Sequence, residues 1–221
     1  MKLEELKGRI PQKLFSVLKK EGIDTLRPAQ EKAVRKGLLE GKNLLVCTPT
    51  ASGKTLIAEL AGVSSILKRE GKCVYIVPLK ALASEKFKDF KRKYSSLLRI
   101  ALSIGDLDSA EPHLIDYDFI IVTSEKLDSL IRHHSPWLRD VKVVIIDEIH
   151  LLDDASRGPT LEILITTLRH LLKNLQVIGL SATIGNPEEL AEWLNANLII
   201  DNWRPVKLHQ GVYFDGKVEF I

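Results

Sequence analysis

The chain has 221 residues, a formal net charge of +3 and only two cysteines. This length is enough for one large α/β domain with a complete core, and the small net charge permits a nucleic-acid partner without requiring one. No apolar run approaches the length of a membrane span, and the N-terminal segment is charged instead of signal-like. We therefore expect a cytoplasmic protein with no membrane partner, in which Cys47 and Cys73 are small buried apolar residues.

The first forty residues predict two helices. The first helix covers residues 11–22, with Pro11 near its first turn and Gly22 at its end. The second helix begins at Pro28 and ends at Gly41, because proline favours the first turn of a helix and glycine favours the position after the last.

Beyond these helices, strand-like apolar runs alternate with helical patterns. The predicted strands cover residues 43–47, 73–77, 100–104, 118–123, 141–147, 175–181 and 197–200, and the helical patterns cover residues 81–94, 124–134, 160–172 and 186–195. This alternation is typical of an α/β fold in which helices cover both faces of a mostly parallel sheet. After Asp201 the pattern changes, and a hairpin around Asp215-Gly216 is predicted instead of another strand–helix unit.

The stretch TPTASGKT, residues 48–55, lies between a predicted strand and a predicted helix. The strict phosphate-loop pattern has glycine where Thr48 stands, and a plain polar turn is the alternative. The order strand, loop, helix nevertheless aims backbone N–H groups at the helix N-terminus, where an anion is favoured. Lys54 would supply a cation to the β- and γ-phosphates, and the hydroxyl of Thr55 would reach Mg²⁺. The expected phosphate-binding residues are Thr50, Ala51, Ser52, Gly53, Lys54 and Thr55.

A second acidic motif, VVIIDEIH at residues 143–150, follows a later strand. Asp147 would lie at the carboxyl edge of that strand, where parallel sheets bind ligands, and would position Mg²⁺. Glu148 would polarise the attacking water. Two acids after a strand can also simply begin a turn or cap a helix, but the phosphate loop upstream favours the nucleotide site.

Taken together, these segments resemble a known family. TPTASGKT, DEIH (147–150) and SAT (181–183) resemble motifs I, II and III of superfamily-two helicases of the DExH type. Four further segments resemble other elements of the family, in the family's order: RPAQ (27–30), PLKALASEK (78–86), GDLDS (105–109) and TSEKLDSL (123–130). RGPTLE (157–162) and DNWRP (201–205) resemble segments of the archaeal Ski-two-like DNA repair helicases, relatives of the helicase part of polymerase theta.

The resemblance implies a RecA-like, three-layer fold, an ATP-dependent helicase activity, and ATP and Mg²⁺ as cofactors. It implies that Gln30 reads adenine, for which an amide is suited, that His150 joins the catalytic set, and that Ser181 and Thr183 couple the γ-phosphate to the rest of the molecule. The implied nucleic-acid contacts are Pro78, Lys80, Gly105, Asp106, Thr123, Ser124 and Lys126. Lys86 could also neutralise a phosphate of the strand, although isolated helix lysines are usually just solvated.

Helicases of this superfamily close two RecA-like lobes on ATP, and the second lobe supplies arginines from a Gln-x-x-Gly-Arg-x-x-Arg pattern. No such pattern occurs in this sequence. We therefore expect a first lobe at residues 1–200, a connection and hairpin at 201–221, and partners that include a second lobe, accessory domains and DNA, single-stranded or forked. The alternatives are an RNA helicase lobe, since no reader of the 2′-OH is evident, and a nucleotide-binding switch that is not a motor.

Overall fold

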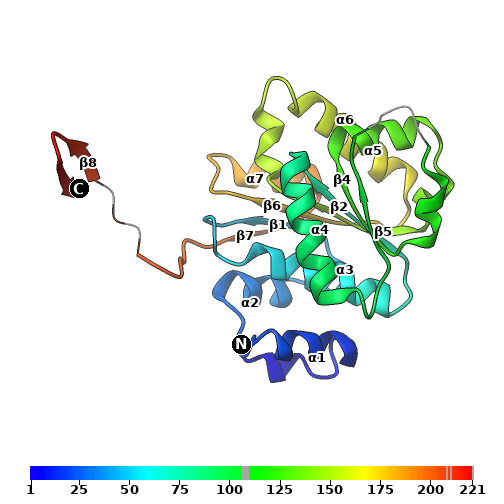
Figure 1. Ribbon diagram of the computed structural model, residues 1–221, viewed down its shortest axis with the longest axis horizontal. Helices are drawn as coiled ribbons and strands as arrows, with labels where there is room; N and C mark the ends of the chain where they lie inside the picture. The colour runs from blue at the N-terminus through cyan, green and yellow to red at the C-terminus, as the bar shows by residue number, and fades with distance from the viewer. Residues whose placement is uncertain (106–109, 208, 210, 221) are drawn as a thin grey trace.

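A seven-stranded sheet forms the centre of the protein (Figure 1). The computed structural model describes residues 1–105, 110–207, 209 and 211–220. All neighbouring strands of the sheet are parallel, in the order β3-β4-β2-β5-β6-β1-β7. The strands are β1 (Leu44–Cys47), β2 (Lys72–Val77), β3 (Ile100–Ser103), β4 (Phe119–Thr123), β5 (Val141–Ile146), β6 (Gln176–Ser181) and β7 (Asn197–Ile200). Every strand that the sequence predicts for this sheet is present.

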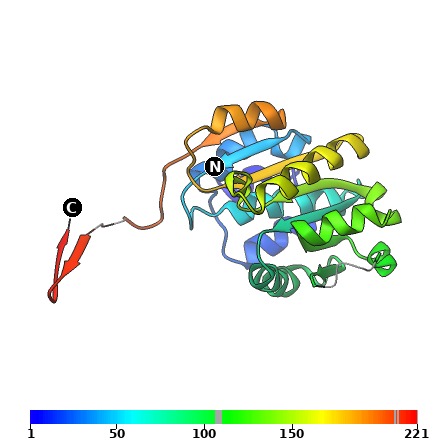
Figure 2. The ribbon, with the colours of Figure 1, turned by 90° about the horizontal axis from the view of Figure 1, so that it is seen from above.

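Helices cover both faces of the sheet, as the alternating pattern predicts (Figures 1 and 2). One apolar layer packs under α1 (Gln12–Lys20), α2 (Pro28–Arg35), α3 (Lys54–Leu67) and α4 (Lys80–Tyr94). The other layer packs under α5 (Ser124–Arg132), α6 (Gly158–Leu171) and α7 (Pro187–Leu194). Neighbouring strand residues contribute to opposite layers, as with Val74 and Tyr75, because successive side chains of a strand point to opposite faces. The fold is therefore the RecA-like three-layer sandwich that the sequence indicates.

The second helix is shorter than the sequence predicts. It ends at Arg35, and a separate short 3-10 turn follows at Leu38–Glu40. Gly37 lies between them with φ of 96°, a left-handed conformation that glycine adopts without the steric cost other residues meet. The predicted end at Gly41 is wrong because Gly37 already terminates the helix.

The chain leaves the sheet after β7 and ends in a hairpin that stands apart from the α/β body (Figures 1 and 2). Strands β8 (Gly211–Phe214) and β9 (Lys217–Phe220) pair antiparallel around Asp215 and Gly216. Both turn residues have positive φ, 45° and 76°, as the favoured two-residue hairpin turn requires. The large side chains of this hairpin, such as Phe214 and Phe220, are exposed.

The sequence predicts that both cysteines are buried and that no segment spans a membrane. Cys47 and Cys73 are buried and form no disulfide, and burial raises the pKa of the Cys47 thiol to about 11. Within the described ranges, no helix is both long and apolar enough to cross a bilayer.

Candidate nucleotide and nucleic-acid site

The loop after β1 carries the phosphate-binding residues predicted from the sequence. Gly53 caps the N-terminus of α3 with φ of 94°, and a Cβ at this position would meet Nε2 of Gln30 at 2.5 Å. Glycine adopts this left-handed conformation without steric cost, whereas a residue with a Cβ would be strained and would also require the Gln30 and Arg27 side chains to shift. The neighbouring Ala51 also has positive φ, 65°, and the hydroxyls of Thr48 and Ser52 form a 2.7 Å hydrogen bond across the loop. This is a tightly turned loop at a helix N-terminus, the geometry that favours an anion.

Lys54 folds back over this loop. Its Nζ donates to the carbonyl oxygen of Thr48 at 2.9 Å and lies 3.5 Å from that of Pro49. Burial lowers the pKa of the Lys54 ammonium, while the charges of Glu148 and Asp147 act in the opposite direction. The loop thus holds a partly desolvated cation over its own carbonyl oxygens.

Asp147 follows β5 at the carboxyl edge of the sheet, as predicted, and is only 8% exposed. Its Oδ2 accepts a 2.8 Å hydrogen bond from the hydroxyl of Tyr75 on β2. The ammonium of Lys86 lies 3.9 Å from the same oxygen and donates to Oγ1 of Thr55 at 2.9 Å. The structure therefore brings Thr55 and Asp147 close to one cationic group, although they are far apart in the sequence.

The oxygens of Thr55 and Asp147 fit a Mg²⁺ ion. Both are hard donors, and both already share one cation, the Lys86 ammonium. In the described part of the chain no three His, Cys, Asp or Glu side chains form a metal-binding group. Mg²⁺ in phosphate-binding enzymes typically uses one or two carboxylates and takes its other ligands from phosphates and water. A donor set with one carboxylate therefore suits a metal that arrives with a nucleotide.

Glu148 and His150 lie next to this centre. Glu148 has φ of 52°, and such a conformation in a non-glycine residue is costly and concentrates at functional sites. Nδ1 of His150 accepts a 3.4 Å hydrogen bond from the backbone N–H of Ala182 and lies 3.4 Å from Oε2 of Glu148. One ring nitrogen of His150 therefore contacts both Glu148 and the segment that contains Ala182.

The segment that contains Ala182 connects the two predicted motifs. Ser181 is fully buried at the end of β6, and its carbonyl accepts from the N–H of Thr48 at 3.2 Å. Thr183 is exposed two residues later. The contacts of Ser181 and Ala182 place the SAT segment between the phosphate loop and the acidic motif, which is the position a coupling element needs.

Gln30 braces the phosphate loop. Its Nε2 donates to the carbonyl oxygen of Gly53 at 2.9 Å, and its Oε1 accepts from the backbone N–H of Arg27 at 2.8 Å. The side chain is 3% exposed. These contacts give Gln30 a loop-positioning role that the sequence did not predict, and the adenine contact stays a prediction.

Arg27 and Trp203 are functional candidates that sequence reasoning missed. Arg27 donates to the carbonyl oxygen of Ala51 at 2.7 Å, and its guanidinium lies 5.3 Å from the centre of the Trp203 ring. The segment that carries Trp203 is also anchored to α2, because Lys32 pairs with Asp201 at 2.8 Å. The phosphate loop is therefore linked by contacts to the segment that leaves the sheet.

The predicted nucleic-acid residues lie at the carboxyl ends of three neighbouring strands. Pro78 and Lys80 follow β2, Gly105 follows β3, and Thr123 and Ser124 join β4 to α5. Lys80 is exposed, whereas Thr123 and Ser124 are each 5% exposed. The hydroxyl of Thr123 caps α5 by accepting from the N–H of residue 126.

Asp106 lies outside the described residues. Lys126 is fully buried, and its ammonium lies 3.4 Å from Oε1 of Glu111, so the prediction that it contacts a phosphate is wrong. Glu111 also accepts from the hydroxyl of Ser103, so this carboxylate links the end of β3 to Lys126 of α5.

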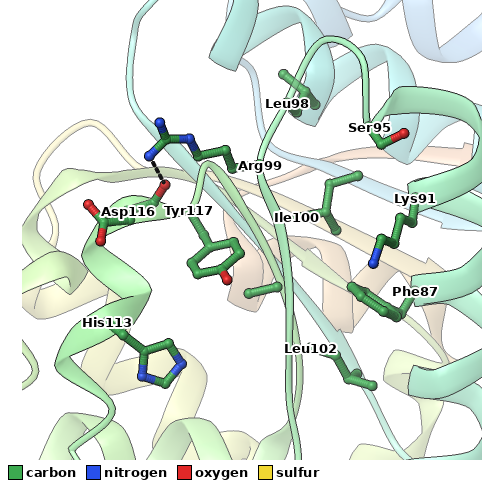
Figure 3. Close-up of a pocket in the computed structure, with 11 residues that line it drawn as sticks. Phe87, Lys91, Ser95, Leu98, Arg99, Ile100, Leu102, His113, Asp116 and Tyr117 are labelled. Carbon is green, nitrogen blue, oxygen red and sulfur yellow. Dashed lines mark hydrogen bonds between the residues drawn. The ribbon is translucent and has the colours of Figure 1, made fainter.

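The surface also has two large cavities. One, of about 740 Å³, runs along the outer edge of β3 and is lined by Phe87, Arg99, His113 and Tyr117 among others (Figure 3). There Arg99 is engaged with the carbonyl oxygen of Asp116 at 3.4 Å. The other, of about 680 Å³, begins at His150. Neither is lined by the phosphate loop, so the nucleotide site is defined by its hydrogen-bonding groups.

Comparison with known proteins agrees with this geometry. The chain is 57% identical over 218 residues to the ATP-dependent DNA helicase Hel308 of Pyrococcus horikoshii, covering 99% of this chain and 30% of that protein. It is 56% identical over 216 residues to the protein of that name from Methanocaldococcus jannaschii, covering 95% of this chain and 18% of that protein. The chain thus spans about a third or less of these relatives.

Solved structures and a family profile point the same way. The crystal structure of the DUF1998 helicase MrfA bound to DNA and AMPPNP superposes with a TM-score of 0.76 at 28% identity, covering 88% of this chain and 29% of that one. MrfA bound to DNA alone gives a TM-score of 0.74 at 28% identity, with 88% and 30% covered. The DEAD/DEAH box helicase profile matches residues 27–190. The chain therefore belongs to the DEAD/DEAH box helicase family.

Proposed function

We propose that this chain is the ATP-binding motor lobe of a DNA helicase that translocates on and unwinds DNA in repair or stalled-fork processing. The observation that carries the proposal is the convergence of Thr55 and Asp147 beside the Lys54 loop. A phosphate loop and a strand-end carboxylate are the two halves of a nucleoside triphosphatase site. The name of the Hel308 relatives supports DNA over RNA as the substrate.

The roles of the nucleotide-site residues follow from their positions. The N–H groups of residues 50–55 and the ammonium of Lys54 bind the phosphates of ATP. Thr55 and Asp147 hold Mg²⁺, which when bound neutralises charge on the phosphates. Tyr75 keeps its proton, because burial raises its pKa well above the ordinary value, and its hydrogen bond orients the carboxylate of Asp147.

Glu148 acts on the attacking water. A general base has to reach the proton it removes, and Glu148 immediately follows Asp147 at the strand end. Its contact with His150, and the hydrogen bond from Ala182 to His150, connect this carboxylate to the SAT segment. A change at the γ-phosphate would therefore be transmitted through His150 to Ser181 and Thr183.

The nucleic-acid surface runs over the loops after β2, β3 and β4, and includes Pro78, Lys80, Gly105, Thr123 and Ser124. These loops share one edge of the sheet because the three strands are adjacent and parallel. Their contacts are to phosphates, made by Lys80 and by N–H and hydroxyl groups, and they are therefore independent of base sequence.

A second RecA-like lobe completes the motor. Residues 1–200 form the first lobe, and residues 201–221 connect it to the second. The exposed apolar side chains of the hairpin, Tyr213, Phe214 and Phe220, are suited to packing against that lobe, since large exposed apolar patches mark interaction surfaces.

Two equilibrium titrations of the chain test the proposal. Binding of a fluorescent ATP analogue with Mg²⁺ is expected to saturate, and ordinary ATP is expected to compete. A labelled single-stranded DNA is expected to bind more weakly as salt rises, whatever its sequence, because counterions are released from the phosphates. Failure to bind any nucleotide would contradict the proposal.

A further inference from the structure

Lys86 occupies a position that its helix does not explain. It lies on α4, which packs over β3 and β4, yet its ammonium reaches Oγ1 of Thr55 at 2.9 Å and lies 3.9 Å from Oδ2 of Asp147. Its side chain is 17% exposed. Lysines on helices are usually solvated, whereas this one is directed into the nucleotide site.

The surroundings give this ammonium an electrostatic function. Asp147 is 8% exposed, and a carboxylate with so little access to water needs compensation by hydrogen bonds or an opposite charge. Tyr75 supplies one hydrogen bond, while Lys54 is turned towards the carbonyl oxygen of Thr48. Lys86 is therefore the cation that joins the carboxylate to the Thr55 hydroxyl.

We infer that Lys86 is a positioning residue that competes with Mg²⁺ for Thr55 and Asp147. This competition sets the Mg²⁺ concentration that the binding of a nucleotide requires. The inference rests on the proposed nucleotide site. A metal bound to both oxygens has to displace the ammonium, because two cations in contact with the same pair of oxygens repel each other. When the metal displaces Lys86, α4, the helix that begins at Lys80, loses this contact with the nucleotide site. Metal binding is therefore linked to the contacts of α4.

The position of Lys86 favours the nucleotide site over the DNA-phosphate contact that the sequence suggested for this residue. An ammonium that touches Thr55 points to the inside of the nucleotide site, whereas Lys80, at the start of the same helix, is exposed. Lys80 and Lys86 thus differ in function, and their variants should affect the binding of different ligands.

The test measures binding of a fluorescent ADP analogue to the chain while Mg²⁺ is titrated from zero. In Lys86→Met, which retains the length of the side chain without its charge, the Mg²⁺ concentration at half-maximal binding is expected to fall about tenfold, since both the competitor and its repulsion are lost. At saturating Mg²⁺ the nucleotide affinity is expected to remain within about twofold of the original.

Two variants make the result specific. Lys86→Arg retains the positive charge and is expected to retain a Mg²⁺ requirement near that of the original chain. Lys88→Met removes an exposed charge from the same helix and is expected to change nothing. Thermal melting of all variants verifies that they fold.

The outcomes separate the inference from the proposed function. An unchanged or higher Mg²⁺ requirement in folded Lys86→Met would overturn the inference, as would a loss of nucleotide affinity at saturating Mg²⁺. In both cases the nucleotide site itself would stand, because binding would still be observed. Absence of nucleotide binding in the original chain would overturn the proposed function and the inference together.

Discussion

Replacement of Lys54 by alanine removes the ammonium that the phosphate loop holds over its own carbonyl groups. In the proposed complex this group bonds to phosphate oxygens, and a hydrogen bond to a charged group contributes about 1.5–3 kcal/mol. At about 1.4 kcal/mol per tenfold change, the nucleotide affinity is expected to fall about 10- to 100-fold. Burial lowers the pKa of this ammonium, so water screens its contacts only in part. We therefore expect the loss of nucleotide affinity to lie towards the upper end of this range.

The assay is equilibrium titration of a fluorescent ATP analogue at saturating Mg²⁺. Lys68→Ala is the matched control, because Lys68 is an exposed cation at the opposite end of α3 and contributes only to the overall charge. Thermal melting verifies that Lys54→Ala folds. A folded Lys54→Ala chain that binds within about threefold of the original would refute the assignment of this loop.

Three other variants test separate parts of the molecule. Asp147→Asn is expected to make nucleotide binding less dependent on Mg²⁺, which titration of metal at fixed nucleotide measures, and an unchanged dependence would contradict the metal role. Lys80→Glu is expected to weaken the binding of single-stranded DNA to a similar extent for every sequence, as measured by anisotropy titration. A loss of binding confined to one sequence would argue against backbone contacts. Lys93→Met leaves buried Glu59 without its 2.8 Å ion pair, and the unfolding free energy in urea is expected to fall by about 3 kcal/mol. Burial raises the pKa of Glu59, so the folded state of this variant holds the proton more tightly, and its stability should decrease further as the pH rises above 4.5, the ordinary value for the carboxyl. A Lys93→Met chain that becomes more stable with rising pH would contradict this account.

Local patterns predicted the sheet and the two halves of the site. The apolar runs, the loop before α3 and the acid after β5 each depend on neighbouring residues, and the structure contains all of them. The orientation of side chains from other elements was not predictable in this way. Tyr75 and Lys86 reach Asp147 from β2 and α4. These contacts depend on β2 lying beside β5 in the sheet, and the spacing of residues along the chain does not predict which strands are neighbours.

The burial of Lys126 was also not predictable from the sequence pattern. Its sequence context, after TSE at the start of α5, is typical of a solvated lysine near a phosphate-binding turn. The short turn before β4 supplies Glu111, which pairs with the ammonium and covers it. Burial here depends on an ion pair between segments separated by a strand, and such a pair is set by tertiary packing.

DNA unwinding driven by this nucleotide site is the central claim, and one chimaera tests it directly. In the Pyrococcus horikoshii relative, the aligned segment of 218 residues is replaced by this chain, with and without Glu148→Gln, and strand displacement from a labelled fork is followed. The account predicts that the chimaera unwinds the fork with Mg²⁺ and ATP, and that Glu148→Gln binds ATP but does not unwind, since the amide cannot serve as a general base. Unwinding by Glu148→Gln at a rate within a few-fold of the unsubstituted chimaera would contradict it.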